Sequence, residues 1–162
     1  MRVRVAGPED WAAIRRVRLA ALQDAPSAFW SAYADEVGQS EQQWRDRIAR
    51  GLKLLALDAG RVVGHAGGFV PADRPDDVEL VAMWVEPTAR GRGVGAVLIE
   101  AVTEWARSIG ASRLHLWVEE NNAAAYRLYC RHGFEPTGQR LPMPTEGRWE
   151  LAMARPLGAG SG

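Results

Sequence analysis

The sequence predicts a single α/β domain with a mixed sheet of six to seven strands and about four helices. Short apolar segments of strand length alternate with longer amphipathic segments of helical period, in the order β-α-α-β-β-β-α-β-α-β-β. The apolar segment Leu80 to Val85 runs directly into a glycine-rich turn and a helix, as the strands of a parallel pair do. No linker or repeat divides the 162 residues, so we expect one domain over 1–156 and a loose tail over 157–162.

The first third of the chain predicts one strand and two helices. Met1 to Val5 alternates apolar and basic residues, as a half-buried strand does. Gly7 to Asp10 then opens a helix, because a proline and two acids favour a first turn. The apolar face of that helix comprises Trp11, Ile14, Val17, Ala21 and Leu22. Residues 25–27 end it, and Ser40, with a glutamine three residues later, caps a second helix that extends to Arg50.

The middle of the chain predicts three strands and the longest helix. Leu52 to Leu57 and Arg61 to Val70 form a hairpin around the turn Asp58 to Gly60. A polar, proline-bearing loop precedes the strand Val78 to Val85, which leads into the glycine turn. Gly110 closes the helix after that turn. The apolar stripe of this helix is formed by Val94, Val97, Leu98, Ala101, Val102, Trp105 and Ile109.

The last third predicts a strand, a helix and a pair of strands. Arg113 to Val118 is the strand, and Asn121 or Asn122 caps a helix that stops at Gly133. Two final strands, near 134–138 and 148–154, flank a proline-rich loop. The hairpins make the first part of the sheet antiparallel, and the strand–helix–strand unit makes the middle parallel.

The charge balance excludes several classes of partner. Twenty Lys and Arg face twenty Asp and Glu, with a pI near 6.8, so nothing in the overall charge favours nucleic acid or a membrane surface. No apolar run approaches about eighteen residues and the first residues lack the apolar core of a signal peptide, so we expect a soluble cytoplasmic protein. The single cysteine, Cys130, excludes an internal disulfide, and its place in a helical turn suggests packing.

The glycine-rich turn carries the strongest functional signal. Its glycines, Gly91, Gly93 and Gly95, let backbone N–H groups approach a phosphate, and the following helix adds its dipole. No Lys follows as a Walker loop requires, and the alternating spacing differs from a Rossmann fingerprint. The turn therefore indicates a ligand with a pyrophosphate group. A flexible Arg-Gly turn that contacts nucleic acid is the alternative.

Two motifs together resemble the GCN5-related N-acetyltransferase (GNAT) superfamily. The first is Arg-x-x-Gly-x-Gly at Arg90, Gly93 and Gly95, after a strand that ends in Val-x-Pro. The second runs from Asn122 through Tyr129 to a Gly-Phe pair and matches N-x-x-A-x-x-L-Y-x-x-x-G-F. The resemblance spans nearly the whole chain and implies the mixed sheet described above, with acetyl-CoA as the acyl donor.

The resemblance also implies which residues hold acetyl-CoA. The backbone of Met83, Trp84 and Val85 pairs with the pantetheine arm as an added strand does. In the family, the asparagine that Asn122 matches bonds the pantetheine amide. The alternative is that Asn122 is simply the N-cap of its helix, and the two roles are compatible. The pyrophosphate falls to the turn and first helical residues Arg90, Gly91, Arg92, Gly93, Val94 and Gly95.

Catalytic roles follow from the same resemblance. Tyr129 matches the tyrosine that lies beside the cofactor sulfur and protonates the leaving thiolate; alternatively it packs against the sheet. A backbone N–H of Met83 or Val85 stabilises the thioester oxygen where the strands splay. Glu79 is the candidate base that deprotonates the amine, directly or through water, with His115 and Glu119 as weaker candidates. No metal is expected.

The acceptor is a primary amine whose identity the sequence leaves open. Trp30, Tyr33, Trp84 and Trp149 are candidate pocket aromatics, unless they are core residues, and Asp35 or Glu36 could attract a cationic amine. Relatives that acetylate ribosomal-protein alanines carry a glutamate five residues before the motif asparagine, where this chain has Trp117. That departure argues against the ribosomal activity.

The leading hypothesis is an acetyl-CoA-dependent N-acetyltransferase that works by direct attack in a ternary complex, because no cysteine is placed to carry the acyl group. A non-catalytic acyl-CoA-binding or regulatory module on the same fold is the alternative. The expected acceptor is an amine on a small molecule or a peptide. Homodimers are common in the superfamily, so the resemblance is compatible with a homodimer.

Overall fold

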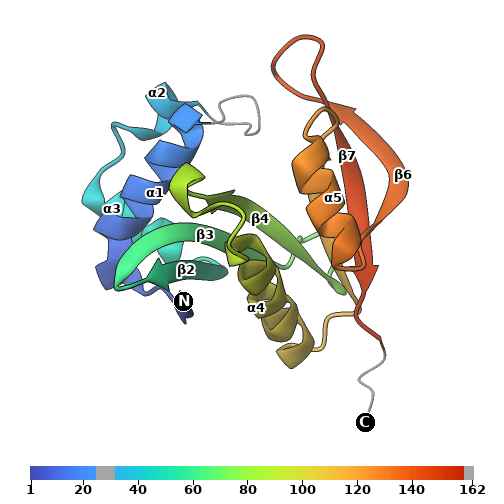
Figure 1. Ribbon diagram of the computed structural model, residues 1–162, viewed down its shortest axis with the longest axis horizontal. Coiled ribbons are helices and arrows are strands. Elements are labelled where there is room, and N and C mark those ends of the chain that lie inside the picture. Colours follow the sequence, from blue (N-terminus) through green and yellow to red (C-terminus); the bar gives the residue numbers. More distant parts are fainter. Residues whose placement is uncertain (25–31, 159–162) are drawn as a thin grey trace.

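The computed structural model describes residues 1–24 and 32–158. Its centre is a seven-stranded sheet in the order β1-β2-β3-β4-β5-β7-β6. Helices cover both faces of this sheet (Figure 1). The predicted α/β architecture and element order are confirmed. The described residues add a one-turn helix, α2 (Tyr33–Glu36), and two short 3-10 helices, η1 (Pro8–Asp10) and η3 (Pro87–Ala89), that the sequence did not predict as separate elements.

The N-terminal half of the sheet is antiparallel. Strands β1 (Arg2–Val5), β2 (Leu52–Asp58), β3 (Arg61–Phe69) and β4 (Asp77–Val85) pair in sequence order apart from the helices inserted after β1. Those helices are α1 (Trp11–Asp24), α2 and α3 (Glu41–Ile48). The predicted capping box is present at α3, where the Ser40 hydroxyl accepts from the Gln43 N–H and the Gln43 side chain accepts from the Ser40 N–H.

The second half of the sheet diverges from the first. Helix α4 (Val94–Ser108) carries the chain to β5 (Arg113–Glu119), which runs parallel to β4. The two strands pair only over three positions, the last of which is Glu79 opposite His115. After helix α5 (Ala123–Arg131), β6 (Glu135–Pro142) and β7 (Trp149–Pro156) complete the sheet by antiparallel pairing beside β5. Beyond Glu79 and His115 the two halves spread apart, which leaves a fork between β4 and β5 (Figure 1).

Two apolar clusters hold the layers together, one on each face of the sheet. The larger packs α4 and α5 against the sheet through residues such as Leu98, Val102 and Phe134. The smaller packs α1 and α3 against β2 and β4 and includes Val17 and the fully buried Trp44. Burial of these side chains is the main term that fixes the helices on the sheet.

A β-bulge at Ala82 changes which side chains of β4 face each cluster. Ala82 has a φ of 55°, and the register with β3 shifts beside it. Strict alternation would put Val78 and Trp84 on one face, yet Val78 packs in the α4 cluster and Trp84 in the α1 cluster. Glu79 and Met83, which an unbroken strand would place on the same face, therefore lie on opposite faces.

The chain end and the first loop depart in part from expectation. Leu157, expected at the start of a loose tail, is buried, and its N–H donates to the Ser112 carbonyl oxygen. The rest of that tail, 159–162, and the predicted helix break at 25–27 lie outside the described residues. Over the part of the chain that is described, no helix is both long and apolar enough to cross a membrane.

Candidate active site

The fork between β4 and β5 opens into a cavity of about 710 Å³. Residues from α1, α3 and β3 line it from one face of the sheet, and residues from α5 line it from the other. The fork itself contributes β4 residues 79–83 and β5 residues 117–119. The divergence of two parallel strands therefore gives a passage between the two faces, and it places Glu79 and Tyr129 on the same cavity.

The glycine turn has the backbone geometry that the sequence predicts. Gly91 and Gly93 have φ values of 76° and 82°, in the left-handed region that glycine adopts without strain. The N–H groups of Gly91, Arg92 and Gly93 bond to no other described residue, and the first-turn N–H groups of α4 have no partner within the helix. N–H donors without protein acceptors at a helix N-terminus suit an anionic group such as a diphosphate.

Gly95 has a different role from the other two glycines. A Cβ atom there would lie 3.0 Å from the Leu128 Cδ2 atom of α5. The missing side chain lets the start of α4 approach α5 closely. Gly95 therefore brings the glycine turn next to the helix that carries Asn122 and Tyr129.

The two arginines of the turn already have carboxylate partners. Arg90 binds Asp24 at the end of α1 and donates to the Val85 carbonyl oxygen, and Arg92 binds Asp58 at 2.9 Å. Asp24 also accepts the indole N–H of Trp84 at 3.0 Å, and this bond and the Arg90 pair hold the pKa of the Asp24 carboxyl below its ordinary value. The Arg90 side chain thus braces the turn against α1 and β4.

Helix α5 presents an amide and a phenol to the cavity. The Asn122 side-chain oxygen accepts from the Ala125 N–H at 3.1 Å, so Asn122 is an N-cap, while its side-chain N–H group has no partner among the described residues. Tyr129 is buried against Phe134 yet lines the cavity, and burial raises the pKa of its phenol strongly. Tyr129 therefore keeps its proton at any physiological pH.

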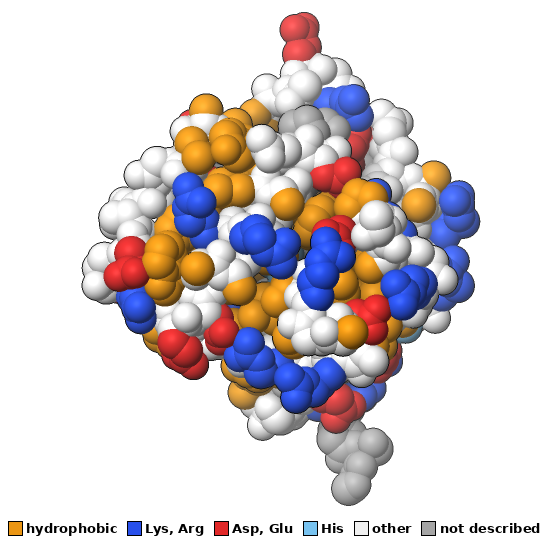
Figure 2. Space-filling model, turned by 60° about the vertical axis from the view of Figure 1, so that its left-hand side comes forward, with side chains coloured by type: hydrophobic (Ala, Val, Ile, Leu, Met, Phe, Trp, Pro, Cys, Tyr) orange, Lys and Arg blue, Asp and Glu red, His pale blue; other side chains and the backbone are white. Residues whose placement is uncertain are grey.

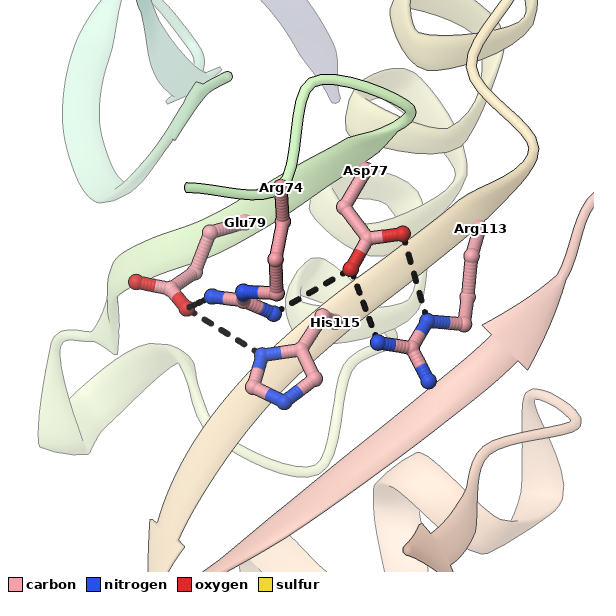
Figure 3. Close-up of polar contacts among 5 residues, drawn as sticks. All are labelled: Arg74, Asp77, Glu79, Arg113 and His115. Atoms are coloured by element: carbon pink, nitrogen blue, oxygen red, sulfur yellow. Dashed lines mark hydrogen bonds and ion pairs between the residues drawn. The ribbon is translucent and has the colours of Figure 1, made fainter. Parts of the chain in front are cut away.

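Glu79 is held by two hydrogen-bond donors at the point where β4 and β5 diverge (Figure 3). Its Oε1 atom accepts from Arg74 at 2.7 Å and lies 3.1 Å from the His115 Nδ1 atom. Burial alone would raise the pKa of Glu79, but the bonds from His115 and Arg74 outweigh it and lower that pKa. The other carboxylate oxygen, Oε2, bonds to no described residue and points away from both partners. Glu79 is thus ionised, oriented and able to accept one further hydrogen bond.

Asp77 anchors the same network one step farther back. Its carboxylate accepts two bonds from Arg113, at 3.2 and 2.8 Å, and one from Arg74 (Figure 3). Arg74 therefore bridges Asp77 and Glu79, and the pair Asp77–Arg113 joins the parallel strands where their pairing begins. The three side chains act as a rigid support for Glu79.

The weaker base candidates have other surroundings. His115 pairs with Glu79 but is 1% exposed and is not part of the cavity wall, so it orients the carboxylate and cannot itself reach a ligand there. Glu119 lines the cavity and forms an ion pair with Arg148. No group of three or more His, Cys, Asp or Glu among the described residues is placed to hold a metal.

Most of the predicted acceptor-pocket residues lie elsewhere. Trp84 is core, Trp149 lies under the Arg140 guanidinium, and Tyr33 is on the outer helix α2; none of the three lines the cavity. Glu36 is buried and binds both Arg18 and Arg47, so it is not available for a cationic amine. Asp35 caps α2, and Trp30 lies outside the described residues.

The expected packing of Cys130 is also wrong, since that thiol is exposed.

The charged wall on the α1 and α3 side was not predicted from the sequence. Arg18, Arg47, Arg50 and Lys53 all line the cavity, together with the buried His65. A signal existed for Arg18 alone: it sits within the apolar stripe of α1, where a charge needs a buried partner. The other members come from separate elements and meet only in the fold.

Comparisons with known proteins agree with this architecture. A family model described as the Acetyltransferase (GNAT) family matches residues 17–134. Mycothiol acetyltransferase from Rhodococcus erythropolis (strain PR4 / NBRC 100887) is 33% identical over 80% of this chain, which spans only 44% of that protein. L-methionine sulfoximine/L-methionine sulfone acetyltransferase from Pseudomonas aeruginosa (strain PAO1) is 32% identical, over 82% of this chain and 88% of that one.

Solved structures show the same fold. The structure of yncA from Salmonella typhimurium with its cofactor acetyl-CoA has a TM-score of 0.78 to this chain. The match covers 97% of this chain and 94% of that chain, at 24% sequence identity. The family model, the identity to a relative that the chain spans over 88% of its length, and the shared fold agree with the glycine turn and the fork. The chain therefore belongs to the acetyltransferase (GNAT) family.

Proposed function

We propose that this protein is an acetyl-CoA-dependent N-acetyltransferase that moves an acetyl group to a primary amine by direct attack in a ternary complex. The observation that carries the proposal is the cavity at the fork, which Tyr129 and Glu79 both line. Donor and acceptor can then approach from opposite faces of the sheet and meet between β4 and β5. The proposal agrees with the family assignment and goes beyond it in naming the acceptor group and the order of events.

The unpaired polar groups of these residues are complementary to the diphosphate and the amides of an acyl-CoA donor. The amides of Gly91, Arg92 and Gly93 supply unpaired donors for a diphosphate, and α4 adds its positive end. The Asn122 side-chain N–H and the divergent edge of β4 near Met83 offer polar groups to an amide-bearing arm. When bound, acetyl-CoA supplies the acetyl group as a thioester, whose C–S bond breaks as the amine nitrogen forms the C–N bond.

Tyr129 stabilises the departing sulfur in this proposal. Its raised pKa keeps the phenol protonated, so it can donate a hydrogen bond to a developing thiolate. Because an alkyl thiol has a pKa of about 8.5, well below that of the buried phenol, the proton stays largely on Tyr129. A backbone N–H of Met83 or Val85, beside the bulge, is the proposed donor to the thioester oxygen.

Glu79 orients the acceptor amine in this proposal. Its pKa lies below the ordinary carboxyl range, whereas an α-amino group has a pKa of about 8, so the amine proton cannot rest on Glu79. The free Oε2 atom accepts a hydrogen bond from the amine or from a water beside it and aims the nitrogen lone pair, and water carries the proton away.

A thiol-release assay across a panel of primary amines tests the proposal. We expect saturable release of free thiol from acetyl-CoA that requires both the amine and the enzyme, with initial-rate patterns that intersect as for a ternary complex. Cys130→Ser should retain the full rate, because that thiol is exposed and outside the cavity wall. Binding of acetyl-CoA without thiol release for any amine would favour the alternative, a non-catalytic acyl-CoA-binding module.

A further inference from the structure

One wall of the cavity is built from cations that come from four places in the chain. Arg18 belongs to α1, Arg47 and Arg50 to the C-terminal part of α3 and the turn after it, and Lys53 to β2. We call these four residues the basic wall. Figure 2 shows the side of the molecule that carries α1 to α3, where Lys and Arg side chains gather around a hollow with apolar side chains in it.

The basic wall has more positive charge than its neighbours neutralise. Glu36 binds both Arg18 and Arg47, so one carboxylate serves two guanidinium groups. Arg50 and Lys53 form no ion pair with any described residue; they donate only to the carbonyl oxygens of Asp46 and Arg50. Four positive charges against one negative charge leave an excess of three. The segments outside the described residues contain no acidic residue that could reduce it.

The protein holds these charges together at a cost. Burial and the nearby charges of Arg47 and Arg50 lower the pKa of Lys53. His65 lies beside them on the cavity wall, 3% exposed, with an Nε2 atom that has no hydrogen-bond partner among the described residues. Burial and the charges of Arg18, Arg47 and Lys53 lower the pKa of His65 to about 3, so its imidazole is neutral. Unpaired buried polar groups are rare in folded proteins, so this Nε2 atom is available to a water or a ligand in the cavity.

The opposite wall has less excess charge. Its carboxylates are Glu79, which is paired with Arg74 and His115, Glu119, which is paired with Arg148, and the buried Glu150. Even with Glu150 counted as one uncompensated negative charge, the excess of three on the basic wall is larger. A carboxylate there can still accept a bond from an amine, as the Oε2 atom of Glu79 shows, but the wall has no large negative excess. The net field of the cavity is therefore positive, which repels polycations and attracts an anionic group toward the basic wall.

We propose that the acceptor is a small amine that carries an anionic group, of which an α-amino acid is the simplest form. This inference rests on the proposed function and names its substrate class. The carboxylate binds Arg50 and Lys53, with His65 as a neutral donor, and the amino group lies toward Glu79 and the fork. Arg18 and Arg47 are positioning residues that keep the wall in place through Glu36. A positive wall also selects against amines with a second cationic group.

The test compares acids with their neutral counterparts. The probes are a panel of L-α-amino acids that includes L-methionine sulfone, the primary amide of each, and one aminoalkylphosphonic acid to separate carboxylate from phosphonate recognition. Thiol release from acetyl-CoA gives kcat/KM for each probe. We expect at least one acid to exceed its amide by about 10²-fold, because two charge-assisted bonds to its carboxylate would be absent with the amide.

The variants are Arg50→Gln, Lys53→Met and the double variant, with Arg45→Gln as the control. Arg45 lies on α3 as well but pairs with Glu41 and is not part of the cavity wall. The double variant should bring the ratio of acid to amide within about threefold by raising KM for the acid, while kcat for the amide and the affinity for acetyl-CoA, from calorimetry, stay within about twofold. Thermal melts of each variant check the fold.

The outcomes separate the two proposals. Thiol release with no acid preferred over its amide, or a preference that survives in the double variant, overturns the inference and leaves the proposed function standing. A loss of acetyl-CoA affinity in the double variant also overturns it, because the cations would then serve the donor. Acid binding by calorimetry that the double variant loses, without thiol release for any amine, supports the anion site and overturns the proposed function.

Discussion

The two faces of the fork are built in different ways. On the α4 and α5 face, the groups that we propose to bind the ligand are main-chain N–H donors from one continuous stretch, Gly91 to Gly95, with one amide and one phenol from α5. On the α1 and α3 face, they are side chains from α1, α3 and β2 that meet only after folding. The first arrangement suits the constant part of a ligand, such as the diphosphate of the donor, because backbone donors are kept when neighbouring side chains are substituted. The second can change its specificity by single substitutions.

Tyr129 offers the largest effect on the donor face. Tyr129→Phe removes the only hydroxyl of α5 that lines the described cavity, so the leaving thiolate loses its donor. We expect kcat to fall by about 10²-fold while the dissociation constant of acetyl-CoA changes little. Tyr126→Phe, a partly buried tyrosine of the same helix outside the cavity wall, is the control and should keep the wild-type rate. A Tyr129→Phe enzyme at full speed would rule out the role.

Glu79 joins the two faces, and its substitution should act on stability as well as rate. Glu79→Gln removes the charge that Arg74 and His115 bind, with an expected loss of about 1–3 kcal/mol in the free energy of unfolding at neutral pH. The folded-state pKa of Glu79 is lowered, so its contribution is present above the unfolded-state pKa and is lost as pH falls through the folded-state pKa.

Denaturant titrations of wild type and Glu79→Gln at a series of pH values measure this contribution. The difference between the two proteins should be constant from neutral pH down to the unfolded-state pKa and shrink below it. The exposed Glu104, which pairs with Arg107, supplies the control Glu104→Gln, with an expected change under about 0.5 kcal/mol. A difference that grows toward acid pH would mean that the network does not stabilise the ionised carboxylate.

The glycine turn separates strain from ligand binding. Gly93 and Gly110 lie at opposite ends of α4, with φ values of 82° and 78° and open space where a Cβ would stand. Alanine at either site should cost about 1 kcal/mol of stability. Only Gly93→Ala should also weaken acetyl-CoA binding, by about tenfold, because it tilts the N–H groups of the turn. Equal affinities of both variants for acetyl-CoA by calorimetry would argue against a backbone diphosphate site.

Arg92 should give the smallest effect. Its side chain is 59% exposed and pairs with Asp58, so Arg92→Gln is expected to change the free energy of unfolding by less than about 0.5 kcal/mol. Affinity for acetyl-CoA should fall only a few-fold and less so at high salt, since screening weakens an exposed charge. A large, salt-independent loss would mean that the side chain, and not the main chain, grips the diphosphate.

Local features of the fold could be predicted from the sequence. The cap at Ser40, the turn at Gly93 and the cap at Asn122 depend on neighbours within a few residues. The order of the elements also follows from local patterns, because each segment shows its own periodicity. The bulge at Ala82 could not, because alanine carries no signal for a positive φ and the cause lies in the pairing with β3. A strand drawn without it would misplace Met83 relative to Glu79.

The acceptor side could not be predicted for a related reason. Glu36 was expected to attract a cation from solution, whereas folding brings Arg18 and Arg47 onto it from two other helices. Contacts between residues eleven and eighteen positions apart leave no periodic trace in the sequence. The predicted aromatic pocket is wrong for Tyr33, Trp84 and Trp149, none of which lines the cavity. Trp84 follows the alternative, a core residue, because a core and a pocket wall require the same residue types, whereas Trp149 contacts the Arg140 guanidinium.

The most direct measurement is a crystal structure of the protein with acetyl-CoA. We expect diphosphate oxygens within hydrogen-bond distance of the amides between Gly91 and Gly95, and the thioester in the fork between Tyr129 and Glu79. A complex with the diphosphate held elsewhere, or with the thioester outside the fork, would contradict it.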